Sequence, residues 1–175
     1  MATRCRGAYG RTMGTIQRSL TTFVLVVLVA LGVTGCGTHF PADPDGTLDR
    51  VSGGVLRVGV SPHEPFTTVS SADPSGSEVA LVEAYAESIA AQVVWRTGGE
   101  EQLVTQLQHG RLDVVIGGLT DKTPWRDQAG LTRPYTESVD EFGQTRQHVM
   151  AAPRGENAFL LSLDTFLQDE GDHQG

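Results

Sequence analysis

The sequence predicts an α/β domain, because short β-rich runs alternate with amphipathic helical runs along the chain. A first strand is expected at Val55–Val60, which is rich in valine and ends at a Ser-Pro turn. A helix is expected at 78–91, where Val79, Val82 and Ala86 recur at steps of three and four residues and so form one buried stripe. The order β-α-β-α-β with short links predicts a mostly parallel sheet flanked by helices, with right-handed crossovers.

The remaining elements follow from the same two patterns. Residues 92–96 form a second β-rich run, and 100–109 form a second amphipathic run that is stopped by Gly110. Residues 112–116 are apolar enough to be a central strand that is buried on both faces. The last expected elements are a short extended piece at 130–135, a strand at 147–152 and a helix at about 156–168.

Residues 1–35 have the three parts of a signal peptide. Four arginines precede position 20, nine apolar residues follow without interruption at 23–31, and small residues lead up to Cys36. Nine apolar residues suit a signal peptide, whereas a membrane-spanning helix needs about 20. We therefore expect this segment to export the chain.

The four residues 33–36, Val-Thr-Gly-Cys, resemble the bacterial lipobox. The resemblance implies that Cys36 accepts diacylglycerol and becomes the lipidated N-terminus, since its thiol is the nucleophile in that modification. Two or three acyl chains hold a protein durably on a membrane. The alternatives are an ordinary secretory signal with a coincidental cysteine, or an anchor that is not cleaved.

The segment after the lipobox is expected to be a flexible tether. Residues 36–54 are rich in Gly, Pro and Asp and show no apolar period. The folded lobe is then expected at 55–168, with a disordered tail at 169–175.

Charge and cysteine content exclude several classes of protein. The formal net charge is −8, and after the four leader arginines the chain carries 9 basic and 21 acidic residues. Such an acidic domain is a poor partner for nucleic acid, which needs a basic face. Residues 37–175 contain no cysteine, and the five histidines show no metal-ligand spacing, so neither a metal site nor another cofactor is expected.

Four segments in the same order resemble the amino-terminal lobe of the family 3 extracellular solute-binding proteins, which include the amino-acid receptors of ABC importers. They are LRVGVSPHEPF (56–66), GSEVALVEAYAESIA (76–90), QLVTQLQHGRLDVVIGGLT (102–120) and LTRPY (131–135). The tail HVMAAPRGENAFLLSLDTFL (148–167) resembles the segment that returns to this lobe. The resemblance implies a single periplasmic-binding-protein-like lobe of type II.

The second lobe of that family is expected to be missing. Only 12 residues, 136–147, separate LTRPY from the returning segment. Independent domains rarely fall below ~40 residues. A ligand would then bind to one face of the lobe, or in a site that a partner completes.

Ligands of open α/β sheets bind beyond the carboxyl ends of the strands. After the first strand, His63 falls where the family's amino-acid receptors place an aromatic residue against the ligand; the alternative is a surface histidine in a turn. Phe66, on the same loop, is a candidate for the ligand wall or for the core. After the strand at 112–116, Gly118 would let a ligand approach the backbone and Thr120 would offer a hydroxyl, unless the glycines only make a tight turn.

A third loop carries Trp125 and Arg126. The family uses an arginine here to bind the ligand's carboxylate in a bidentate fork. This sequence has one residue more than the usual spacing between the threonine and the arginine. Arg126 and Trp125 are both candidate ligand residues: either Arg126 binds the carboxylate, or the extra residue displaces it and Trp125 stands at the aligned place.

Two functions remain after these observations. The first is a lipid-anchored protein on the extracytoplasmic face of the membrane that binds a small, amino-acid-like solute for or alongside an ABC importer. The second is an interaction protein that contacts a permease or another envelope protein through the uncovered edge, where Trp125, His63 and Tyr135 would supply aromatic contacts. An enzyme is not expected, because the sequence shows no GxSxG motif, no nucleophilic cysteine and no acid and base placed on one loop.

Overall fold

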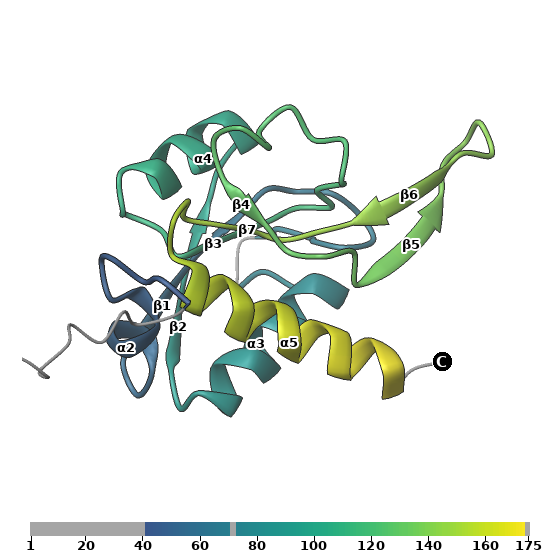
Figure 1. Ribbon diagram of the computed structural model, residues 1–175. Coiled ribbons are helices and arrows are strands. Elements are labelled where there is room, and N and C mark those ends of the chain that lie inside the picture. Colours follow the sequence, from purple (N-terminus) through teal and green to yellow (C-terminus); the bar gives the residue numbers. More distant parts are fainter. Residues whose placement is uncertain (1–40, 71–72, 174–175) are drawn as a thin grey trace, which may run out of the picture. The chain divides into compact units, whose positions relative to one another are not determined.

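The computed structural model describes residues 41–70 and 73–173 (Figure 1). The predicted signal peptide, the lipobox and Cys36 lie outside the described residues. The elements in chain order are α2 (Thr47–Val51), β1 (Val55–Val60), α3 (Ser77–Ser88), β2 (Gln92–Thr97), α4 (Glu100–Gln108), β3 (Val114–Ile116), β4 (Gly130–Leu131), β5 (Thr136–Val139), β6 (Thr145–His148), β7 (Ala151–Ala152) and α5 (Asn157–His173).

Five strands form one mixed sheet in the order β2-β1-β3-β7-β4. β1 pairs in parallel with β2 and with β3, so that Val58 lies opposite Trp95 on one side and Val114 on the other. The two-residue strand β7 runs antiparallel to both β3 and β4. The predicted α/β class and mostly parallel sheet are confirmed, and the parallel strands are those that alternate with helices in the sequence.

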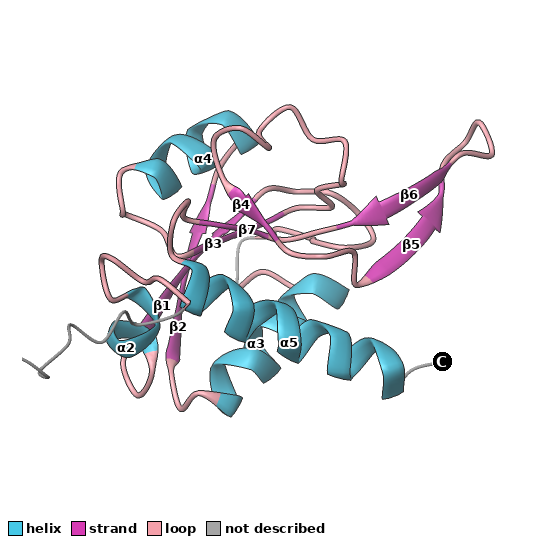
Figure 2. Ribbon diagram, viewed as in Figure 1, coloured by secondary structure: helices cyan, strands magenta, loops and turns pink. Residues whose placement is uncertain are grey.

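Helices cover both faces of this sheet, with α4 on one side and α2, α3 and α5 on the other (Figure 2). Leu56, Val58 and Val60 alternate along β1 and pack into the larger apolar cluster, beneath α3 and α5. The smaller cluster contains Leu103 and Leu107 of α4 and Val115 of β3. Each face of the sheet therefore has its own apolar core.

The prediction of a flexible tether is wrong for residues 41–54, which are folded onto the domain. Val51 of α2 is fully buried in the larger cluster. Arg50 binds Asp113 beside the sheet, with 2.7 Å between its guanidinium nitrogen and Asp113 Oδ1. The sequence pattern does not indicate this helix, because it is only five residues long and has no apolar period of its own. Tertiary contacts stabilise it.

Asp113, which directly precedes β3, is a fully buried charge that joins α2 to β1. Its carboxylate accepts hydrogen bonds from Arg50 of α2 and from both the backbone and the guanidinium of Arg57 in β1. Burial would raise the pKa of Asp113, but the hydrogen bonds from Arg57 and Arg50 outweigh it and hold that pKa below its usual value. The network fixes α2 to the amino end of β1.

The prediction of a disordered tail from 169 is also wrong, because α5 continues to His173. Leu163 and Leu167 are buried along its length, and the Gln168 side chain donates to the carbonyl of Pro134 at 3.2 Å. The helix therefore contacts the segment before β5 close to the residue at which its apolar stripe ends.

The chain between β4 and β7 forms a separate two-stranded hairpin. β5 and β6 pair antiparallel, with Thr136 opposite His148 and Val139 opposite Thr145. The strand predicted at 147–152 is thus two strands, since β6 belongs to the hairpin and β7 to the central sheet. In the described part of the chain, the segment between β4 and β7 forms this hairpin and not a second lobe, as its short length predicted.

Candidate functional site

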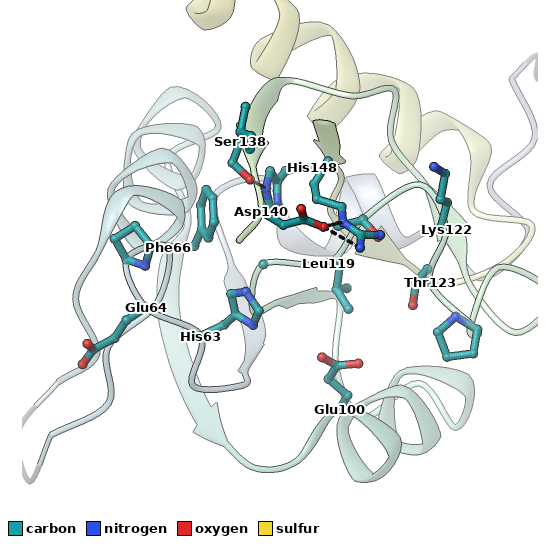
Figure 3. A pocket seen from close by; sticks show the side chains of 16 residues that line it. His63, Glu64, Phe66, Glu100, Leu119, Lys122, Thr123, Ser138, Asp140 and His148 are labelled. Atoms are coloured by element: carbon teal, nitrogen blue, oxygen red, sulfur yellow. Dashed lines mark hydrogen bonds and ion pairs between the residues drawn. The ribbon is translucent and has the colours of Figure 1, made fainter. Parts of the chain in front are cut away.

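A pocket of about 710 Å³ lies where the loops after β1 and β3 meet the hairpin. Its position beyond the carboxyl ends of two parallel strands is the place where open α/β sheets bind ligands. The lining residues are His63, Glu64, Pro65, Phe66, Glu100, Gly118, Leu119, Thr120, Lys122, Thr123, Pro124, Ser138, Val139, Asp140, Arg146 and His148 (Figure 3).

The structure brings four of the six predicted ligand residues together in this pocket. His63, Phe66, Gly118 and Thr120 all line it. Trp125 and Arg126 do not. The Trp125 indole lies against the smaller apolar cluster and donates to Glu100 Oε2 at 3.1 Å, which turns the side chain into a support for the loop.

Gly118 is needed for a contact within the protein. Its φ of 64° is the left-handed conformation that favours glycine, and a Cβ here would lie 2.3 Å from the His63 ring. The close approach that the sequence suggested for a ligand is therefore made by the His63 imidazole. Any larger residue at this position would displace His63 from the pocket wall.

The backbone amides after β3 are already occupied by Glu78. This fully buried side chain lies in the first turn of α3, and its Oε2 accepts the N–H groups of Gly117 at 2.8 Å and Gly118 at 3.0 Å. Its Oε1 accepts the Tyr135 hydroxyl at 2.5 Å. A ligand's carboxylate would thus find these two amides filled, and must bind through side chains.

Tyr135 closes this internal network. Burial raises the pKa of the Tyr135 hydroxyl, and the negative charge of Glu78 raises it further. The hydroxyl therefore stays protonated and donates to the carboxylate. The network holds the start of α3, the loop after β3 and the segment before β5 in one arrangement behind the pocket.

Aromatic rings form the inner wall of the pocket. The ring of Phe66 lies near those of His63 and His148, with ring centroids 6.0 Å and 4.0 Å away. His148 Nε2 is 2.7 Å from the Ser138 hydroxyl. Burial lowers the pKa of His148, against the opposing charge of Glu78, so its neutral form is favoured.

The hairpin supplies the outer wall and its own ion pair. Asp140 Oδ2 lies 2.7 Å from the Arg146 guanidinium, and Asp140 Oδ1 accepts the backbone N–H groups of Phe142 and Gln144. The hydrogen bond from Gln144, with that from Arg146, lowers the pKa of Asp140. One side chain therefore fixes the turn and aims Arg146 along the pocket.

Charges of both signs surround the remaining space. Lys122, on the loop after β3, is exposed, and its side chain makes no hydrogen bond or ion pair with the residues that the structure describes. Glu100 offers its second carboxylate oxygen beyond the one that binds Trp125. The Thr120 and Ser138 side chains line the same space. This arrangement suits a small solute that carries both a cationic and an anionic group.

Sequence reasoning missed the hairpin and the network behind it. Lys122, Ser138, Asp140, Arg146 and His148 all line the pocket without having been predicted to do so. A signal was present for Lys122, which follows the predicted Thr120 by two residues on the same loop. The hairpin residues carried none, because the segment is too short to show a clear alternation of apolar and polar residues.

Comparison with known proteins agrees with the fold. The model of the bacterial extracellular solute-binding proteins, family 3, matches residues 56–170. The chain belongs to this family. Family 3 consists mainly of solute-binding receptors, which are not enzymes, and its members act outside the cytoplasm. A search of curated proteins found no match.

Solved structures with a similar fold include receptors for amino acids. The arginine-bound form of domain 1 from TmArgBP has a TM-score of 0.61 and 22% identity, over 69% of this chain and 97% of that chain. A periplasmic binding protein of Salmonella typhimurium with high arginine specificity has a TM-score of 0.58 and 12% identity, covering 67% and 93%. The L-cystine solute receptor of Neisseria gonorrhoeae has a TM-score of 0.62 and 13% identity, covering 74% and 92%. Similarity at this level establishes the fold of the family 3 lobe.

Within the residues that the structure describes, no helix is both long and apolar enough to cross a membrane.

Proposed function

We propose that this chain is a lipid-anchored, extracytoplasmic receptor that binds a small, amino-acid-like solute for or alongside an ABC importer. The observation that carries the proposal is the pocket between the single lobe and the β5–β6 hairpin. It has walls on two sides even though a second lobe is lacking. The anchor is the acylated Cys36 that the lipobox predicts.

The size and lining of the pocket support this proposal. A volume of about 710 Å³ lies in the range of small-molecule sites, roughly 300–1,000 Å³. Lys122 and Arg146 are the cations available to a carboxylate, and Glu100 is a carboxylate available to an ammonium group. Phe66 and Leu119 supply apolar contact.

A single lobe of this fold is enough to hold a ligand in one similar protein. The arginine-bound form of domain 1 from TmArgBP is a structure of one domain, and this chain covers 97% of it. That protein supports the proposal that the present lobe binds a solute without a second lobe. The hairpin would add the contacts that a second lobe makes elsewhere in the family.

A second candidate function is protein interaction through the hairpin. Val139 and Phe142 are 70% and 78% exposed, and large apolar side chains so exposed are common in interaction sites. The aromatic residues that the sequence offers for such a contact also make contacts within the lobe. Trp125 is hydrogen-bonded to Glu100, Tyr135 to Glu78, and His63 packs on Gly118.

The test is a thermal-shift screen of the mature chain without lipid, using amino acids and small carboxylates. A solute at 100 times its Kd adds about 2.7 kcal/mol of stability, which raises the melting temperature of a domain of this size by roughly 5–15 °C. Lys122→Ala should weaken the binding of the hit about tenfold or more, because a charge-assisted hydrogen bond contributes about 1.5–3 kcal/mol.

Arg126→Ala is the matched control, because Arg126 is an exposed cation on the same loop that does not line the pocket. Its affinity should equal that of the wild type. Loss of binding in Arg126→Ala with none in Lys122→Ala would contradict this site and return the role to the arginine predicted from the family. A cooperative melt that no solute shifts would favour the interaction protein.

A further inference from the structure

The folded lobe begins close to the proposed lipid attachment. The carbonyl of Ala42 accepts the N–H groups of Asn157 at 2.7 Å and Ala158 at 3.1 Å. Asp43 Oδ2 accepts the N–H of Leu48 at 2.9 Å. The chain is thus fixed to the domain from residue 42, and only residues 37–41 separate it from Cys36. Fully extended, these six Cα-to-Cα steps span at most ~20 Å.

This attachment is held by buried groups on several elements. The carboxylate of Glu156, itself buried, accepts the N–H groups of Asp45 and Thr47, each at 3.1 Å. Arg50 binds the buried Asp113, and Val51 lies in the larger apolar core. Residues 42–51 therefore stay folded on the lobe and do not lengthen the tether.

The attachment and the pocket lie at opposite ends of the sheet. α2 leads into the amino end of β1, whereas the pocket residues His63 and Phe66 follow its carboxyl end. Figure 1 shows α2 and the β5–β6 hairpin on opposite sides of the lobe. The six residues of β1 alone span about 20 Å, and a lobe of roughly 130 residues is about 35 Å across.

We propose that the lipidated protein stands with its α2 end toward the bilayer and its pocket open to the aqueous space. The inference rests on the acylation of Cys36 in the proposed function. Turning the pocket toward the bilayer would lift the α2 end about 35 Å above it, which a tether of ~20 Å cannot span.

The test places one fluorophore at each end of the lipidated protein in vesicles. Asp49→Cys labels the exposed side of α2, and Phe142→Cys labels the hairpin tip. The added thiol is the only reactive one, because acylation consumes that of Cys36 and Cys5 lies in the removed leader. With nitroxide-labelled lipid headgroups, the label at 49 should lose about half of its fluorescence or more, since the ~20 Å tether keeps it near the headgroups. The label at 142 should lose almost none.

Inserting about twenty Gly/Ser residues between Phe40 and Pro41 adds a flexible span of roughly 25 Å, and should make the two labels respond alike. Equal quenching without the insert, or stronger quenching at 142, would overturn the orientation while leaving the anchor intact. The anchor is tested separately by the mass of the mature protein and by Cys36→Ser, which should not bind vesicles. A chain without acyl groups would overturn both the anchor and the orientation.

Discussion

Glu78 determines which groups of the loop after β3 are free to bind a solute. Its buried carboxylate accepts the N–H groups of Gly117 and Gly118 and the hydroxyl of Tyr135. The negative charge in the first turn of α3 is also favoured by the helix dipole. Recognition of a solute is therefore left to side chains such as Lys122 and Arg146, which reach the pocket from the two walls.

Replacing Glu78 by Gln should destabilise the whole lobe. The amide keeps the shape of the side chain but removes the charge. Its NH₂ group cannot accept the hydrogen bonds that the replaced carboxylate oxygen of Glu78 accepts. We expect a loss of about 2–4 kcal/mol in the free energy of unfolding, measured by urea denaturation. Glu83→Gln is the matched control, because Glu83 is exposed on the same helix. A change there should stay within about 0.5 kcal/mol. Equal stability of the two variants would show that the Glu78 network contributes nothing.

Single residues of the site could be predicted only where a strand end places them. His63, Phe66, Gly118 and Thr120 were expected in the pocket because they follow β1 and β3, and all four line it. Trp125 and Arg126 were also candidates for ligand contact, and neither lines the pocket. The roles of the glycine and of the histidine could not be predicted, since they depend on a ring and a carboxylate that come from elsewhere in the chain.

At the scale of elements, α2 shows how tertiary contacts override composition. Residues 41–54 have the Gly, Pro and Asp content of a linker, yet they hold a helix against β1 and α5. The apolar groups that could have revealed it are few, because only Val51 is fully buried among them. The charge pair of Arg50 with Asp113 joins positions 63 residues apart, and no local pattern indicates it.

Removing this segment should lower the stability of the lobe, although its composition alone predicts a linker that the fold does not need. A chain that starts at Val55 loses the buried side chain of Val51, worth about 1.5–3 kcal/mol, together with one of the two arginine partners of Asp113. A chain that starts at Pro41 keeps both and serves as the control. We expect a clearly lower melting temperature only for the shorter chain, by calorimetry. If the two chains melt at the same temperature, α2 is not part of the stable lobe.

The β5–β6 hairpin is the second structural feature that could not be predicted from the sequence. Counting residues between β4 and the returning segment correctly excluded a second lobe. The same 12 residues gave no strand signal, because Ser138, Asp140 and Arg146 are polar and the hairpin has little apolar surface to bury. What fixes it is the turn built on Asp140, an arrangement that only the structure shows.

At the scale of the whole molecule, the fold was predictable and the depth of the site was not. The alternation of strands and helices, with the apolar strand β3 in the middle, leads to a three-layer α/β arrangement by general rules. With a single lobe, a ligand was expected to bind to one face or in a site that a partner completes. The structure instead closes the site on a second side with the hairpin, so the pocket keeps two walls without a second domain.

The proposed site for a small polar solute lies between the lobe and the hairpin. The most direct measurement is a titration of the isotope-labelled mature chain, with backbone amide shifts followed by NMR. If the solute binds there, the largest changes should occur on both walls together, at the loop residues His63, Phe66, Leu119 and Lys122 and at Ser138 and Asp140 of the hairpin. Changes on one wall alone, changes confined to the hairpin tip around Phe142, or no changes with any solute would contradict it.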